Sequence, residues 1–145
     1  MNEMTRKILV AFDDSPASHK AFDLALEFSR CQEGGGPPIV VLSVVQVPDL
    51  IDVSMDLEPI INAARAKIEA AQEGLRAKAA AFGQEVRFEC VIGHAAETIV
   101  DFANQQGIDM IFLGNRGRAR IAEWLLGSVS HQVAGEARCT VTIVK

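Results

Sequence analysis

The fold of this chain is decided by the stretch from Asp109 to Ser130, which reads DMIFLGNRGRARIAEWLLGSVS. Its first apolar run, Met110 to Leu113, is typical of a short strand that is buried on both faces of a sheet. Its last residues begin a helix, because Ser128 is a residue type that caps the open amides of a helix start. A buried strand followed by a loop and a helix is the repeating unit of an α/β fold with a parallel sheet.

Three glycines interrupt this stretch at a spacing that suits phosphate binding. Gly114 ends the strand, Gly117 follows in the loop, and Gly127 directly precedes Ser128. Glycine permits positive φ angles and lets a ligand approach the backbone where a Cβ would block it. The open amides at a helix start favour anions, phosphate above all. The loop adds three positive side chains, Arg116, Arg118 and Arg120. We interpret the stretch as a phosphate-binding loop.

A Gly-Ser pair before a helix can also be no more than a cap. The full spacing Gly-x2-Gly-x9-Gly-Ser/Thr is expected by chance in about one chain in two hundred of this length. Its place between a predicted strand and a predicted helix is the context that a phosphate loop needs. Two other phosphate motifs are absent from the sequence, because no glycine is followed by lysine and no Gly-x-Gly-x-x-Gly occurs.

The sequence resembles the nucleotide-binding branch of the universal stress protein family. The glycine motif from Gly114 to Ser128 matches the motif of that branch, and Asp13 matches the acid that closes the first strand. Gly93-His94 before a predicted helix agrees as well, so the resemblance covers nearly the whole chain. Two departures are visible: Asp14 stands where a glycine is common, and Thr140 stands where the family often has proline before the last strand.

Apolar runs alternate with helical patterns along the whole chain. The predicted strands cover residues 7–12, 39–47, 85–91, 110–113 and 140–144, and the predicted helices cover residues 15–30, 57–82, 95–106 and 128 to about 137. This alternation predicts a single α/β domain, residues 1–145, with an open parallel five-stranded sheet and helices on both faces. The resemblance implies the strand order 3-2-1-4-5 of the adenine nucleotide α-hydrolase-like fold.

Helical spacing also predicts which side chains of the helices face the core. For the first helix these are Ala21, Leu24, Ala25 and Phe28. For the longest helix they are Ile61, Ala64, Ile68, Ala71, Leu75, Ala79 and Phe82. For the third helix they are Ile99, Val100 and Ala103.

Composition narrows the classes of function. The net charge of −5 over 145 residues argues against nucleic acid as a general partner, because phosphate backbones demand a positive surface. No apolar run approaches the roughly 18 residues of a membrane span, and the first one is too short for a signal peptide. Cys31, Cys90 and Cys139 are widely spaced and odd in number, which favours reduced thiols in the cytoplasm. With the three histidines they show no zinc-ligand spacing, and we predict no metal ligands.

In an open parallel sheet, ligands bind at the carboxyl ends of the strands where the strand order reverses. Asp13 is either a turn residue at such an end or a ligand contact. The resemblance implies an adenine nucleotide there, ATP or AMP, with Mg2+ on its phosphates. The site residues that it implies are Val44 through its backbone for the adenine; Ala11, Phe12 and Asp13 for the base and ribose; Leu113, Gly114, Asn115, Arg116 and Gly117 around the phosphates; and Gly127, Ser128, Val129 and Ser130 as N–H and hydroxyl donors.

Three functions follow from these residues. The first is a nucleotide-binding stress-response or regulatory protein with slow or no turnover and an unidentified protein partner. The second is a slow ATPase or an autophosphorylating enzyme that uses Ser128 or Ser130. Hydrolysis needs a positioned water, and near the glycine loop only Glu123 and Asp13 are candidates to orient it. The third is a flavodoxin-like electron-transfer module, which the absence of tyrosine and the place of Trp124 disfavour.

Two further expectations concern assembly and ligand coverage. The apolar strand 140–144 lies at a sheet edge in the implied order, and bare edges invite pairing. The resemblance implies a homodimer through this strand, antiparallel to its mate. A threonine at position 140 leaves an N–H that proline would lack, and we expect it to be available for pairing. Residues 46–56 are too long for a turn and carry several apolar side chains, which predicts a lid over the base end of the nucleotide.

Overall fold

The computed structural model describes residues 6–31, 38–47, 54–115 and 127–145. In chain order these parts form β1 (Ile8–Ala11), α1 (Pro16–Arg30), β2 (Ile39–Val45), α2 (Glu58–Phe82), β3 (Val86–Ile92), α3 (Ala95–Gln106), β4 (Met110–Gly114), α4 (Ser128–Glu136) and β5 (Thr140–Val144). Most of the expected lid, together with Arg116, Gly117 and the rest of the arginine loop, lies outside the described residues.

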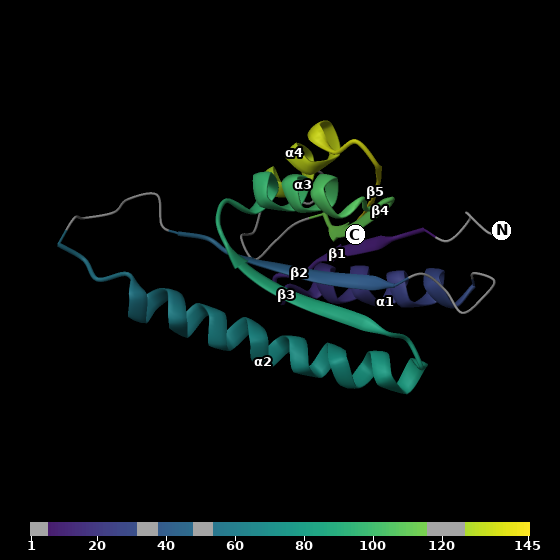
Figure 1. The fold of residues 1–145 in the computed structure, drawn as a ribbon, viewed down its shortest axis with the longest axis horizontal. Helices are drawn as coiled ribbons and strands as arrows, with labels where there is room; N and C mark the ends of the chain where they lie inside the picture. The colour runs from purple at the N-terminus through teal and green to yellow at the C-terminus, as the bar shows by residue number, and fades with distance from the viewer. Residues whose placement is uncertain (1–5, 32–37, 48–53, 116–126) are drawn as a thin grey trace.

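The strands form one sheet in the order β3-β2-β1-β4-β5, and neighbouring strands are parallel. Helices α1 and α2 cover one face, and α3 and α4 cover the other (Figure 1). The predicted fold class, strand order and two-sided covering are therefore confirmed. The chain order reverses at β1, which pairs with β2 on one side and with β4 on the other.

The core is divided between the two faces of the sheet, which explains why the strands read as continuous apolar runs. Ile8 and Val10 on β1 pack with α1 and α2, whereas Leu9 between them packs with α3 and α4. All three side chains are fully buried. A central parallel strand that is covered on both sides has no position for a polar side chain.

The predicted inner faces of the helices are correct in part. Ala21 and Ala25 of α1 are buried, but Leu24 is 39% exposed, so its prediction is wrong. Phe22 and Leu26 occupy the core instead. Each helical residue turns the helix by about 100°, so a buried face centred on these four positions leaves position 24 on the rim facing solvent.

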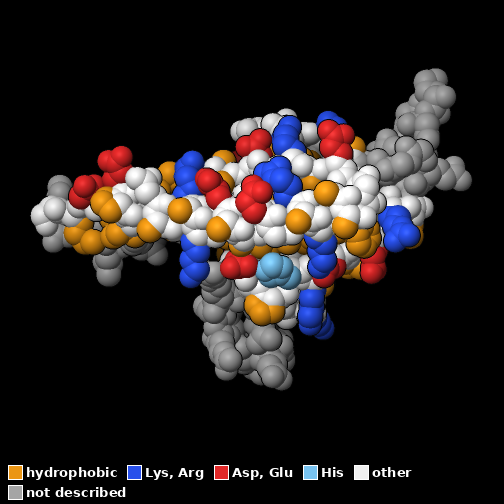
Figure 2. Space-filling model, turned by 90° about the horizontal axis from the view of Figure 1, so that it is seen from below, with side chains coloured by type: hydrophobic (Ala, Val, Ile, Leu, Met, Phe, Trp, Pro, Cys, Tyr) orange, Lys and Arg blue, Asp and Glu red, His pale blue; other side chains and the backbone are white. Residues whose placement is uncertain are grey.

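Helix α2 departs further from prediction because it is longer than the sheet that it covers (Figure 1). Leu75 and Ala79 in its second half are buried as expected. Ala64 is exposed, because the first turns extend beyond the carboxyl end of β2. Phe82 in the last turn is 41% exposed, under the guanidinium of Arg30 at 5.6 Å, so its predicted inward position is also wrong. Acidic and basic side chains are interspersed with apolar ones on the side of the molecule seen from below (Figure 2), as on a solvated surface.

Strand β5 forms one edge of the sheet, as the implied order required. The amide of Thr140 donates to the carbonyl of Asp109 at 3.3 Å, toward β4. The expectation that this N–H is available to a second copy is therefore wrong. Since successive residues of a strand point their amides to opposite sides, the outward amides of β5 belong to Val141 and Ile143.

Candidate functional site

A cavity of about 430 Å3 lies at the carboxyl ends of the strands, where β1 and β4 separate and the chain order reverses. This is the place at which open α/β sheets meet their ligands. The structure brings together there most of the residues that the resemblance implied: Ala11, Phe12, Asp13, Val44, Leu113, Gly114, Gly127, Ser128, Val129 and Ser130. Asn115 is buried and is not among the residues that line the cavity, and Arg116 and Gly117 lie outside the described residues.

The start of helix α4 is the polar end of this cavity. Gly127 is its N-cap, with φ −64° and ψ 157°, and no side chain caps the helix. The prediction that Ser128 is the cap is wrong by one residue, because Ser128 is already the first helical position. The amides of Ser128, Val129 and Ser130 have no carbonyl acceptor within the helix. These donors, together with the helix dipole, favour an anion in the cavity.

Two groups expected to face phosphate are instead used inside the protein. The amide of Gly127 donates to the carbonyl of Asn115 at 2.7 Å. The hydroxyl of Ser130 lies 2.9 Å from that same carbonyl and 3.0 Å from the carbonyl of Gly127. Both groups already have partners within the protein, so the donors left at this end are the next amides along the helix and the exposed hydroxyl of Ser128.

Gly114 lines the cavity for a reason that differs from the predicted one. Among the described glycines, positive φ angles occur at Gly83 and Gly107, so Gly114 does not need one. A Cβ on Gly114 would lie 2.6 Å from the Cβ of Ala17, 3.0 Å from its carbonyl carbon and 3.1 Å from the amide nitrogen of Ser18. Glycine is required here because β4 passes against the backbone of α1.

The loop between β1 and α1 forms the adjacent wall. Asp13 turns one carboxylate oxygen to the amide of Ser15 at 2.9 Å, and Ser15 caps α1 by accepting from the amide of Ser18. Asp14 has a φ of 67°, a left-handed conformation that explains why a glycine is common at this position. Its carboxylate is held 2.8 Å from the ring nitrogen Nε2 of His19. Asp13 thus serves both as a turn residue and as a wall of the cavity.

The rest of the cavity lining is largely apolar. Sequence reasoning missed several of the residues that form it, among them Leu42, Val45, Ala64, Ile68, Ala95 and Ile99. They come from β2, α2 and α3, three elements that are far apart along the chain. Ala64 and Ile68 reach it because α2 overhangs the carboxyl edge of the sheet. Ser15 and Ser18 also line the cavity, and their place at a helix start after Asp13 was the one signal that could have identified them.

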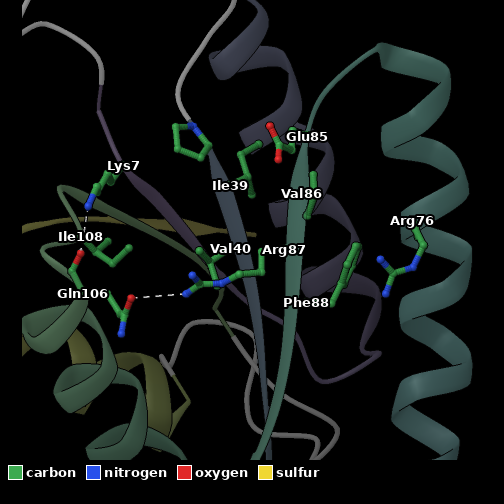
Figure 3. A pocket seen from close by; sticks show the side chains of 11 residues that line it. Lys7, Ile39, Val40, Arg76, Glu85, Val86, Arg87, Phe88, Gln106 and Ile108 are labelled. Carbon is green, nitrogen blue, oxygen red and sulfur yellow. Dashed lines mark hydrogen bonds between the residues drawn. The ribbon is translucent and has the colours of Figure 1, made fainter.

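A second hollow, of about 670 Å3, lies at the opposite ends of the strands (Figure 3). Three cations line it, but each is already engaged. Arg87 lies 3.4 Å from carboxylate oxygen Oε1 of Glu89, and Lys7 donates to the carbonyl of Gln106 at 3.4 Å. Arg76 lies over the ring of Phe88 at 4.5 Å, on the other side of β3 from Arg87 (Figure 3). These charges do not converge on one point, so the candidate site is the cavity at the carboxyl ends.

Within the described ranges, no three His, Cys, Asp or Glu side chains come together as metal ligands. None of the described helices is long and apolar enough to cross a membrane.

A sequence profile, sequence relatives and solved structures all indicate the same protein family for this chain. The sequence profile of the Universal stress protein family matches residues 4–145. Universal stress protein YxiE of Bacillus subtilis is 31% identical over 98% of this chain and 100% of its own. Universal stress protein UspA from Lactobacillus plantarum has a TM-score of 0.82 at 25% identity, covering 99% of this chain and 100% of that one. A family protein from Arabidopsis thaliana, solved with AMP bound, covers 97% of this chain and 91% of its own, with a TM-score of 0.71; its 20% identity shows a shared fold alone.

Proposed function

This chain belongs to the universal stress protein family, and we propose that its carboxyl-end cavity binds an adenine nucleotide, ATP or AMP. In this proposal the protein belongs to the nucleotide-binding branch of the family and acts in the cytoplasm as a stress-response or regulatory module with slow or no turnover. The AMP bound to the Arabidopsis thaliana family protein supports the class of ligand.

The observation that carries the proposal is that one cavity combines a polar, anion-binding helix start with an aliphatic lining. The start of α4 offers three amides that have no acceptor within the helix, and the rest of the cavity is lined largely by aliphatic side chains. A nucleotide has the same division, since its phosphates are anionic and its base is flat and largely apolar. With phosphate at α4, the base lies toward Val44, where the backbone at the end of β2 supplies hydrogen bonds.

The cavity could also hold a Mg2+ ion bound to the phosphates of the nucleotide. Mg2+ usually binds through one or two carboxylates together with substrate phosphates and water. Asp13 is the one carboxylate among the described residues that line the cavity, and one of its oxygens already accepts the Ser15 amide. Phosphate oxygens and water would therefore supply most ligands of the ion, and its charge would offset that of a triphosphate.

The same residues favour slow or no turnover over the enzymatic alternative. Hydrolysis of a triphosphate needs a group that orients the attacking water. Asp13 carries the only described lining carboxylate, and it is committed to the turn before α1. Ser130 is a poor phosphate acceptor because its hydroxyl is buried and hydrogen-bonded to main-chain carbonyls. Autophosphorylation would therefore have to use the exposed Ser128.

Ser128→Asp tests the proposed site without disturbing the core. The residue is exposed, and an acidic side chain in the first turn suits the helix dipole, so we expect the fold to remain. A carboxylate beside the phosphates should raise the Kd for ATP at least about tenfold in calorimetric titration, which corresponds to a loss of about 1.4 kcal/mol of binding free energy. Adenosine, which has no phosphate, should bind as before.

Gly135→Asp is the matched control, because it adds the same carboxylate to α4 at an exposed position with open space around it. Its ATP affinity should equal that of the wild type. Mass spectrometry of the ligand that co-purifies with the wild type should identify an adenine nucleotide. Failure of the folded wild type to bind ATP or AMP at millimolar concentration would refute the proposed function.

A further inference from the structure

We propose that Ser130 is a positioning residue, which together with the peptide group of Asn115 holds the start of α4 in place for phosphate. We call the hydrogen bonds that join Asn115, Gly127 and Ser130 the clasp. The inference rests on the proposed function, because it concerns the anion-binding end of the same cavity. It assigns to the Ser130 hydroxyl a role in orienting the donor amides, and no contact of its own with the ligand.

The clasp centres on one carbonyl oxygen. The carbonyl of Asn115, directly after β4, accepts the Gly127 amide at 2.7 Å and the Ser130 hydroxyl at 2.9 Å. The hydroxyl also lies 3.0 Å from the Gly127 carbonyl and shares its single proton between the two acceptors. The N-cap and the third residue of α4 are thus both tied to the end of β4.

The other side of the Asn115 peptide ties the clasp into the sheet. Its amide donates to the carbonyl of Val144 in β5 at 2.8 Å. Asn115 is 7% exposed and Ser130 is 2% exposed, so these bonds are shielded from water. A hydrogen bond in such surroundings is costly to lose, because a buried carbonyl then stays without its partner. The start of α4 is therefore fixed relative to both β4 and β5.

Helix α4 starts without a side-chain cap, as α2 and α3 also do, and it is the shortest of the described helices. It is nine residues long, and its N-cap Gly127 has no side chain to hold the first turn. Helix α1, in contrast, is capped by the side chain of Ser15. Amide donors bind phosphate well only when they point at it, since hydrogen bonds weaken steeply as the donor angle falls toward 120°. The clasp holds the start of α4 as the side chain of Ser15 holds the start of α1.

Ser130→Ala removes the hydroxyl and leaves the ligand-facing amides intact. We expect ATP affinity to fall about three- to tenfold while adenosine affinity stays unchanged, because the perturbed donors meet phosphate alone. In the protein without ligand, amide hydrogen exchange should become faster at Gly127 and His131, whose amides donate to the carbonyls of Asn115 and Gly127. Ser130→Thr keeps a hydroxyl and should restore both measurements. Ser130→Cys, with a weaker donor, replaces the alanine variant in the same assays if that variant does not fold.

Ser29→Ala is the control for general loss of stability. Ser29 is a fully buried serine in the last turn of α1 that does not line the cavity, and its hydroxyl donates to the side-chain oxygen of Gln84 at 2.8 Å. Its variant should unfold at a lower temperature yet bind ATP as the wild type does. This separates the clasp from any effect that follows merely from losing a buried hydroxyl.

The outcomes distinguish the inference from the function on which it rests. If the wild type binds ATP and Ser130→Ala binds it equally well, with unchanged exchange, the clasp has no positioning role. Equal weakening of ATP and adenosine would also overturn it, because the effect would then be general loosening of the cavity. If the wild type binds neither ATP nor AMP, the proposed function fails, and exchange in Ser130→Ala alone decides whether the clasp holds the helix.

Discussion

Gly114→Ala separates two reasons for a glycine in the phosphate motif. If glycine is there to admit a ligand, alanine should reduce nucleotide binding and leave the empty protein stable. If it is there because β4 touches α1, alanine should destabilise the protein even without ligand. The distances favour the second reason, because the added Cβ would lie 2.6 Å from the Cβ of Ala17 and 3.1 Å from the amide nitrogen of Ser18.

The magnitude follows from what the new methyl group meets. Two of the three close atoms belong to the backbone of α1, so no side-chain rotation can relieve the overlap, and the helix must shift. Overpacking of this kind typically costs 1–3 kcal/mol, and we expect the upper half of that range, about 2–3 kcal/mol. For a chain of this length such a loss should lower the unfolding midpoint by about 5–10 °C in a thermal melt followed by circular dichroism.

Gly74→Ala is the matched control, since Gly74 lies within α2 and a Cβ there meets nothing within 4 Å. It should raise stability by up to about 1 kcal/mol, through helix propensity alone. Adding Ala17→Gly to Gly114→Ala removes the closest contact and should restore part of the loss, while the backbone contacts remain. The reasoning is refuted if ligand-free Gly114→Ala melts within 1 °C of the wild type.

Two further predictions concern the sheet edge and the thiols. We expect a homodimer through β5, and Val141→Pro removes one of its outward amides, so sedimentation should change from dimer to folded monomer at micromolar concentration; a persisting dimer would exclude this edge as the interface. Burial raises the pKa of the Cys90 thiol against the opposing charge of Arg65. At pH 7 iodoacetamide should therefore label the exposed Cys31 first, with Cys90 labelling accelerating as pH rises; equal rates at pH 7 would contradict the burial argument.

The fold was predictable because its determinants are local and repeated. A fully buried strand such as β1 must be apolar at each position, so the run from Ile8 to Val10 is visible without any knowledge of its neighbours. Exposure within helices was less predictable, because it depends on where the sheet ends. Ala64 keeps helical spacing with the buried Leu75 but is exposed, because it lies in the first half of a helix that extends beyond the sheet (Figure 1), and only the packed structure shows this.

The candidate site was predictable in its residues and less so in their roles. Gly114 and Gly127, which the spacing singled out, do line one cavity. Gly114, however, is required because β4 passes against α1, and Gly127 is an N-cap whose amide already donates to the carbonyl of Asn115. The clasp could not have been predicted, because the partner of Ser130 is the carbonyl of Asn115, a main-chain atom that no residue pattern marks. The aliphatic lining was missed for the same reason, since its residues share no motif.

The amides at the start of α4 and the arginines of the loop should have different roles, because a helix start carries only a limited positive charge. The amides of Ser128, Val129 and Ser130 together carry the partial positive charge of one helix terminus, about half an elementary charge. These three neighbouring donors cover about the size of one phosphate group. Further phosphates need cations of their own, and among the described residues the cavity lining has none. The sequence supplies them at Arg116, Arg118 and Arg120, within the same motif. Under the proposed function, the preference for ATP over AMP should therefore depend on these arginines, whereas affinity for the single phosphate that both nucleotides carry should depend on how firmly the clasp holds α4.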